Sequence, residues 1–388
     1  MNARITIVVA TWMACAGLAC AQPLAMTFRN VAGLGGTAMD QFGVTFTVTG
    51  MSGISRDGGD FWAVMDNSNK LVRLAIVVSA NGTITSAAIV GGLSLADSWD
   101  FEGIVATGRG TVLLSEETTP GVHEYSLATG ARVRTLAIPP VFAAIRPNNG
   151  FESLALGAAG AWTANEQALT VDGGIATPSA GTVVRLLRFT PALAAAEQFA
   201  YVSEPLHGSV ISGSTGGLSD VLMLPDGRLV ALERSLAGSI SGLFRSRVYE
   251  VAVAGATDVS GIAGLIGATY TPVGKTLLYS GDQQNMEGLG LGEALGPGRW
   301  SVIGIVDDGD PISVNRVVGF EVAGVGECVA NCDASTTVPA LNVNDFICFG
   351  NLFAGGESRA NCDGSTAVPV LNVNDFVCFI TAFAAGCS

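Results

Sequence analysis

The segment Phe101-Glu102-Gly103-Ile104-Val105 decides the fold of this chain, because related segments return along it. After each copy come a polar or glycine-rich turn and an apolar run that ends in an acidic residue. The copies begin at Met51, Phe101, Phe151, Leu218 and Met286, and the first three are 50 residues apart. A self-similar unit of this length, built from strands and turns, is typical of the blades of a β-propeller.

Each repeat predicts a blade of four strands. In the second repeat we expect them at residues 102–106, 111–116, 122–127 and 132–138. The fifth repeat offers only three, so a strand from the N-terminal segment is expected to complete it and close the ring. Five motifs favour five blades, and the wider spacing of the last two leaves a sixth, degenerate blade open. We therefore expect an all-β propeller over residues 22–325, followed by a small α-helical module over residues 326–388.

The first 21 residues have the pattern of a signal peptide. Arg4 precedes an apolar run over residues 5–18, and Ala19-Cys20-Ala21 fits a cleavage site. A lipid-modified Cys20 is the alternative. No other apolar run has the length of a membrane span, so we expect a secreted, extracellular or cell-surface protein.

Charge and composition limit the classes of partner. The chain has 388 residues, a formal net charge of −14 and 49% hydrophobic residues. Lys70 and Lys275 are its only lysines, which argues against nucleic acid as a partner, because phosphates require a basic face. The acidity suits a protein that binds cations, or one that binds anions through bound cations. An ordinary acidic secreted protein is the alternative.

The strand pattern places carboxylates in the central channel. Glu102 and Ile104 share one face of their strand, and an innermost strand turns one face to the channel. The equivalent acids of four blades are expected to converge there as the candidate catalytic set: Glu102, Glu152, Asp220 and Glu287. Convergence without a cation would be opposed by like-charge repulsion, which favours bound calcium. The alternative is that each carboxylate is a structural latch between blades.

A second group of acids ends the following strands. We expect these near one rim of the propeller, some of them as solvated rim charges: Asp66, Glu116, Glu117, Glu166, Glu233, Asp307 and Asp308. Arg56, Arg146 and Arg234 flank motif strands and can either bind phosphate or pair with these acids. No Gly-x-Ser-x-Gly motif occurs, and His123 and His207 are the only histidines, which argues against a Ser-His-Asp triad.

Three runs resemble one secreted family, called "esterase-like activity of phytase". They are residues 149–156, 217–234 and 285–289. The resemblance covers roughly residues 27–323. It implies a β-propeller and, by the family's name, hydrolysis of a small phosphoester or other ester.

The C-terminal module contains two similar units. Asn331-Cys332-Asp333 opens a polar loop before one apolar run of helix length, and residues 361–363 repeat it before another. EF-hand loops carry oxygen ligands at alternating positions and end on a carboxylate. The residues that meet this pattern are Asp333, Ser335, Asn342, Asp345, Asp363, Ser365, Asn372 and Asp375.

The two units resemble dockerin-type repeats, which implies calcium binding and a cohesin-like or cell-surface protein partner. Each loop departs from the usual pattern by one extra residue, by the lack of Asp at the third and fifth places, and by a proline, Pro339 or Pro369, that replaces the turn-glycine region. The alternative is a disulfide-stapled helix pair whose aspartates cap the helices. Six cysteines of an exported module indicate disulfides, with fifteen pairings open: Cys328, Cys332, Cys348, Cys362, Cys378 and Cys387.

Two functions compete at this point. One is a calcium-assisted phosphoester hydrolase with its site in the acidic channel. The other is a non-enzymatic extracellular binding propeller displayed through its dockerin-like tail.

Overall fold

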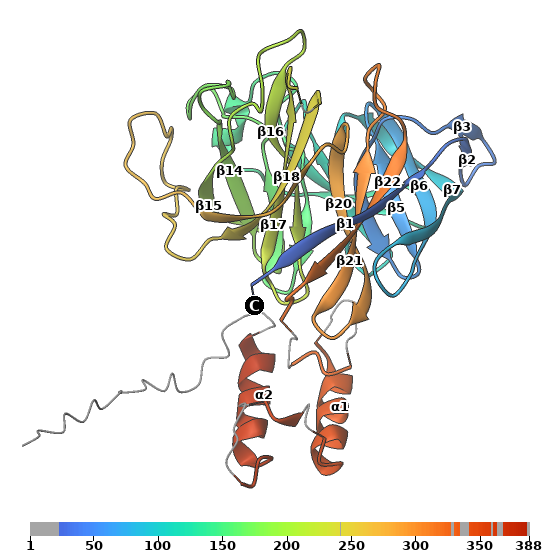
Figure 1. The fold of residues 1–388 in the computed structure, drawn as a ribbon, viewed down its shortest axis with the longest axis vertical. Coiled ribbons are helices and arrows are strands. Elements are labelled where there is room, and N and C mark those ends of the chain that lie inside the picture. Colours follow the sequence, from blue (N-terminus) through green and yellow to red (C-terminus); the bar gives the residue numbers. More distant parts are fainter. Residues whose placement is uncertain are drawn as a thin grey trace, which may run out of the picture.

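The computed structural model describes residues 23–240, 242–326, 330–333, 341–357, 360–362 and 368–385. In this part of the chain, five four-stranded antiparallel sheets stand around a central axis, and two helices follow (Figure 1). The five-bladed, all-β propeller is therefore confirmed. The predicted signal peptide, residues 1–21, lies outside the described residues.

In four blades the strands follow one another in chain order, from the innermost strand to the outermost. Blade 1 contains β4 (Met51–Asp57), β5 (Asp60–Met65), β6 (Ser68–Val78) and β7 (Ile84–Trp99). Blade 2 contains β8 (Phe101–Ala106), β9 (Thr111–Glu116), β10 (Gly121–Ser126) and β11 (Arg132–Thr135). Blade 3 contains β12 (Ala155–Gly157), β13 (Gly160–Ala164), β14 (Val183–Phe189) and β15 (Ala195–Val202). Blade 4 contains β16 (Thr215–Met223), β17 (Leu229–Leu236), β18 (Phe244–Ala252) and β19 (Gly274–Gly281).

The fifth blade joins the two ends of the propeller. It contains β20 (Met286–Gly296), β21 (Arg299–Val306), β22 (Arg316–Ala323) and, outermost, β1 (Ala25–Gly33). β1 pairs antiparallel with β22, from Ala25 opposite Ala323 to Gly33 opposite Arg316. The expected closure by an N-terminal strand is confirmed. A hairpin of β2 (Thr37–Met39) and β3 (Thr45–Thr47) and the 3-10 helix η1 (Pro140–Ala144) lie outside the five sheets.

The motif strands come so close together that glycine is required between them. A Cβ on Gly103 would lie 2.7 Å from the carbonyl carbon of Ser153 in the next blade. On Gly288 it would lie 2.6 Å from the carbonyl oxygen of Ser52. The third residue of the motif therefore lies in the narrow space between blades. The second residue turns to the channel.

The C-terminal module contains α1 (Val343–Ala354) and α2 (Val373–Ala385), below the propeller in Figure 1. Phe349 and Phe379 stack between the two helices with ring centroids 4.2 Å apart. Disulfides join Cys332 to Cys348 and Cys362 to Cys378, one in each unit. Cys328 and Cys387 lie outside the described residues. None of the helices in the described residues is long and apolar enough to span a membrane.

Candidate functional site

One end of the channel is lined by a ring of buried polar side chains, one from the second motif position of each blade. Their exposed fractions are 9% or less: Ser52, Glu102, Glu152, Ser219 and Glu287. The strand pairing is irregular at this point in four blades, for example between Met51 and Gly53 and between Phe101 and Ile104. Such bulges re-aim side chains and are frequent beside functional sites.

Two groups of carboxylates meet at this end. Oxygen atoms of Asp66, Asp100 and Glu102 lie within 4.8 Å of one another. Oxygen atoms of Glu117, Glu152 and Glu166 do the same, and all three of these side chains are buried. We call the two groups together the acidic mouth. Of the four expected catalytic residues, the structure brings Glu102 and Glu152 into it.

Glu117 is a buried member of this mouth and not a solvated rim charge. It is 2% exposed, and its Oε1 atom has no hydrogen-bond partner in the described part of the chain. Glu116, Glu166, Glu233 and Asp307 are also buried, and of the seven second acids Asp66 and Asp308 have partly exposed side chains. The sequence shows the pair Glu116-Glu117 at the end of a strand but does not show which of the two turns inward.

Glu287 lies beside the two groups and is paired. Its Oε1 atom accepts a hydrogen bond from Arg234 at 2.6 Å, and Ser52 donates to its other oxygen at 3.2 Å. Arg234 also donates to Glu166 at 2.8 Å. Arg234 therefore forms the salt bridges that were one of its two expected roles, and it fixes Glu166 relative to Glu287.

Asp220 does not join the ring, because it occupies the third motif position, where Gly103 and Gly288 stand in other blades. Its carboxylate lies between blades and accepts the backbone N–H of Leu289 at 2.6 Å and of Val221 at 2.8 Å. Burial nevertheless raises its pKa well above the usual range. Its geometry is that of the structural latch.

The acidic mouth is electrostatically unfavourable for ionised carboxylates. Burial, aided by Asp100, raises the pKa of Asp66 to about 7. Burial also raises the pKa of Glu117 to about 7 and holds the pKa values of Glu102 and Glu152 well above their usual range. Protons or a bound cation must offset this repulsion.

Unpartnered polar atoms surround the same place. Besides Glu117 Oε1, the buried Ser219 Oγ and Arg234 Nε atoms have no hydrogen-bond partner among the described residues. Buried polar groups are rarely left so, and ions or waters commonly satisfy them. Oxygen donors arranged in this way suit a hard cation such as calcium.

A family model described as "Phytase-like: Esterase-like activity of phytase" matches residues 47–310. The chain belongs to this phytase-like family. The match spans the motif strands and all six carboxylates of the acidic mouth.

Solved structures match this chain at low identity. The PQQ-bound aldose sugar dehydrogenase of Streptomyces coelicolor is 12% identical, with 78% of this chain and 100% of that chain covered and a TM-score of 0.37. The calcium-binding protein regucalcin of Agrobacterium tumefaciens is 13% identical, with 76% and 97% covered and a TM-score of 0.36. These scores are too low to carry an argument about chemistry. A search of curated proteins found no match.

In the tail of this phytase-like chain, four of the described candidate ligands cap the helices: Asn342, Asp345, Asn372 and Asp375. Asp345 is fully buried and accepts the backbone N–H of Asn342 at 2.7 Å, while Asn342 accepts that of Asn344 at 2.9 Å. Asp375 is likewise buried and accepts the N–H of Asn372 at 2.8 Å. The backbone N–H of Asp333 lies 3.4 Å from Asp345 Oδ1. Ser335, Asp363 and Ser365 lie outside the described residues.

The raised pKa values of the mouth predict how stability depends on pH. The folded protein binds more protons than the unfolded chain above the normal carboxylate pKa, so stability falls as pH rises through the folded values of about 7 for Asp66 and Glu117 and about 8 for Glu287. His123, whose pKa is lowered from 6.5 to about 4, has the opposite effect, confined to lower pH. In chelator, the melting temperature of the propeller should fall between about pH 6.5 and 8. Calcium should raise it most at the upper end; a flat or rising profile in chelator would contradict this electrostatic account.

Proposed function

We propose that this chain is a secreted, calcium-assisted ester hydrolase that acts at the acidic mouth on small phosphoesters. The observation that carries the proposal is the pair of carboxylate groups with an unpartnered, buried Glu117 oxygen among them. Membership of a family described by the esterase-like activity of phytase supports the reaction class. The disulfides of the tail support an extracellular location.

The donor atoms fit calcium, which takes about six to eight oxygen ligands. Asp66, Asp100 and Glu102 would hold one ion, and Glu117, Glu152 and Glu166 a second. When bound, calcium would supply the positive charge that attracts and polarises an anionic phosphoester. Lys70 is bound to Asp40 and Ser94, and Lys275 to Glu204 and Glu233, so neither lysine serves this site.

The remaining roles follow from the contacts of the side chains. Burial, and then the charges of Glu102, Glu117 and Glu166, raise the pKa of Glu152. We assign to the Glu152 oxygen that would not hold calcium the acceptance of a proton from the water that attacks the ester, and the return of that proton to the alcohol oxygen that leaves. Arg234 holds Glu287 and Glu166 in position. Asp220 is assigned a positioning role, as the latch between blades 4 and 5.

Removing charge from the mouth should remove the activity. Glu102→Gln and Glu152→Gln preserve size, and each should lower kcat/KM for p-nitrophenyl phosphate with calcium by about a hundredfold or more. Glu197→Gln is the matched control, because Glu197 is 40% exposed and pairs with Arg188 away from the channel. Full activity in both mouth variants would place the site elsewhere.

The non-enzymatic binding propeller remains the second candidate, favoured by the close pairing of Glu287 with Arg234. If the parent protein binds calcium yet hydrolyses neither p-nitrophenyl phosphate nor p-nitrophenyl acetate, this candidate replaces the hydrolase. Loss of calcium binding in Glu152→Gln would still locate the cation in the mouth.

We further propose that the tail is a dockerin-like attachment module that binds calcium and a cohesin-like or cell-surface protein. Apolar side chains exposed on both helices support a docking role: Val343, Phe346, Ile347, Val373, Val377 and Ile380. Asp345 and Asp375 already end their loops as buried carboxylates. A calcium ion there would have to share their oxygens with the capping N–H groups.

Equilibrium dialysis tests the tail sites in the full chain. The double variant Asp345→Asn and Asp375→Asn should bind two fewer calcium ions per chain than the parent, while the calcium held in the propeller stays. An unchanged stoichiometry would leave the aspartates as helix caps alone.

A further inference from the structure

The channel changes character along its length. Behind the polar ring lies an apolar layer with one side chain from each blade, all 8% exposed or less: Ile54, Ile104, Leu154, Leu222 and Leu289. In blades 1, 2, 3 and 5 this residue comes two positions after the polar one, and all five apolar side chains line the cavity described below. This layer separates the acidic mouth from the opposite end of the channel.

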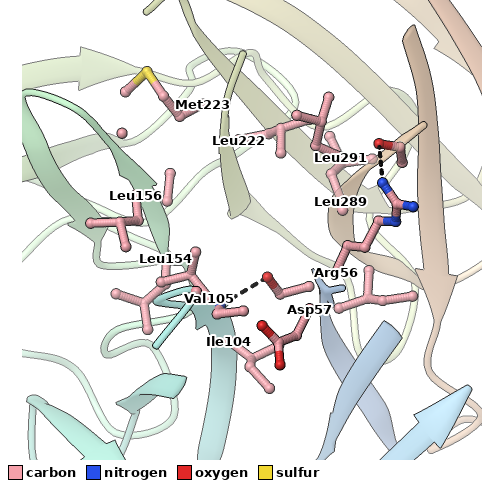
Figure 2. A pocket seen from close by; sticks show the side chains of 18 of the residues that line it. Arg56, Asp57, Ile104, Val105, Leu154, Leu156, Leu222, Met223, Leu289 and Leu291 are labelled. Atoms are coloured by element: carbon pink, nitrogen blue, oxygen red, sulfur yellow. Dashed lines mark hydrogen bonds between the residues drawn. The ribbon is translucent and has the colours of Figure 1, made fainter. Parts of the chain in front are cut away.

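A cavity of about 750 Å³ opens on the far side of this layer. Its walls include Leu156, Met223 and Leu291 from the ends of three motif strands, as Figure 2 shows. Leu341, which directly precedes the capped start of α1 in the tail, also lines it. Its size falls within the range of about 300–1,000 Å³ typical of small-molecule pockets.

Arg56 is a charged residue of the cavity wall. It comes four positions after the polar residue of its motif, where blades 2, 3 and 5 have Ala106, Leu156 and Leu291. Figure 2 shows it along the wall beside Leu289 and Leu291. Its Nε atom is buried without a hydrogen-bond partner among the described residues. Its other nitrogens reach the carbonyl of Gly292 at 3.5 Å and Glu293 at 3.1 Å.

At this end, the Arg56 guanidinium is the group placed to bind an anion, because its buried Nε–H has no hydrogen-bond partner among the described residues. The Glu293 side chain is 53% exposed, and an ion pair so open to water contributes little to stability. The Arg56 guanidinium can therefore turn toward a ligand. Arg109 and Asp57 also line the cavity, and with Glu293 beside Arg56 two cationic and two anionic side chains lie at this end. Guanidinium groups bind carboxylates through paired, charge-assisted hydrogen bonds.

We propose that this cavity binds an amphipathic monoanion, a fatty-acid-like carboxylate free in solution. Its apolar chain lies among Leu156, Met223 and Leu291, and its carboxylate accepts hydrogen bonds from Arg56. Leu341 completes the wall, so the ligand contacts the propeller and the tail together. The apolar layer separates this site from the acidic mouth, and the inference holds whether or not the mouth is catalytic.

Calorimetric titration of the full chain with dodecanoate, below its micelle concentration, tests the proposal. The parent protein should bind one dodecanoate per chain and bind the neutral dodecanol at least several-fold more weakly. Arg56→Gln should weaken dodecanoate binding about tenfold through loss of a charge-assisted hydrogen bond. Arg73→Gln is its control, since Arg73 is 52% exposed and pairs with Asp60.

Two variants fill the cavity, so a folding defect in one leaves the other to decide. Leu156→Trp and Met223→Trp should each abolish binding while the melting temperature stays at or above that of the parent. Val133→Trp, at a position that is 56% exposed on β11, should bind as the parent does. The proposal is overturned if the parent does not bind millimolar dodecanoate, or if folded cavity-filling variants bind it unchanged. Equal binding of dodecanol, with no effect of Arg56→Gln, would overturn the anionic recognition.

Discussion

The close approach of the five innermost strands governs the rest of this molecule. In blades 1, 2 and 5 the third motif position has no room for a side chain beside the next strand, which is why glycine stands there. Blade 4 uses this space differently, with the Asp220 carboxylate bonded to the backbone of the next blade. Because the strands are held at this distance, each position of the motif lies at a defined depth along the channel.

Stacked levels give the channel two unlike ends. Acidic side chains line the first depth of the channel, and apolar side chains line the second. The side chains at the third depth line the cavity beside the tail. Because burial raises the pKa of the acids, the first level favours a cation or retained protons. Arg234 neutralises only part of this charge, since it reaches Glu166 and Glu287 but leaves Glu117 Oε1 without a partner.

The repeats in the sequence were sufficient to predict the propeller, its five blades and its closure by the N-terminal strand. They also predicted that Glu102 and Glu152 converge, because both occupy the second position of the motif, although Glu152 precedes β12 and the register is irregular at Glu102. Asp220 was grouped with them, although a shift of one position in the motif directs it between blades, and the bulge that accompanies the motif in blade 4 is not visible in residue types. The inward turn of Glu117 depends on where β9 ends, which sequence alone fixes only within a few residues. The disulfide pairing likewise required the structure, because six cysteines allow fifteen pairings.

The central claim is that the carboxylates of the mouth share a cation. Long-wavelength diffraction from crystals of the full chain grown in calcium tests it most directly, through the anomalous signal of calcium itself. The account predicts a peak at about 2.3–2.6 Å from carboxylate oxygens of Glu117 and Glu152, the usual calcium–oxygen distance. An empty mouth in calcium, with Glu117 and Glu152 in contact through a shared proton, would contradict it.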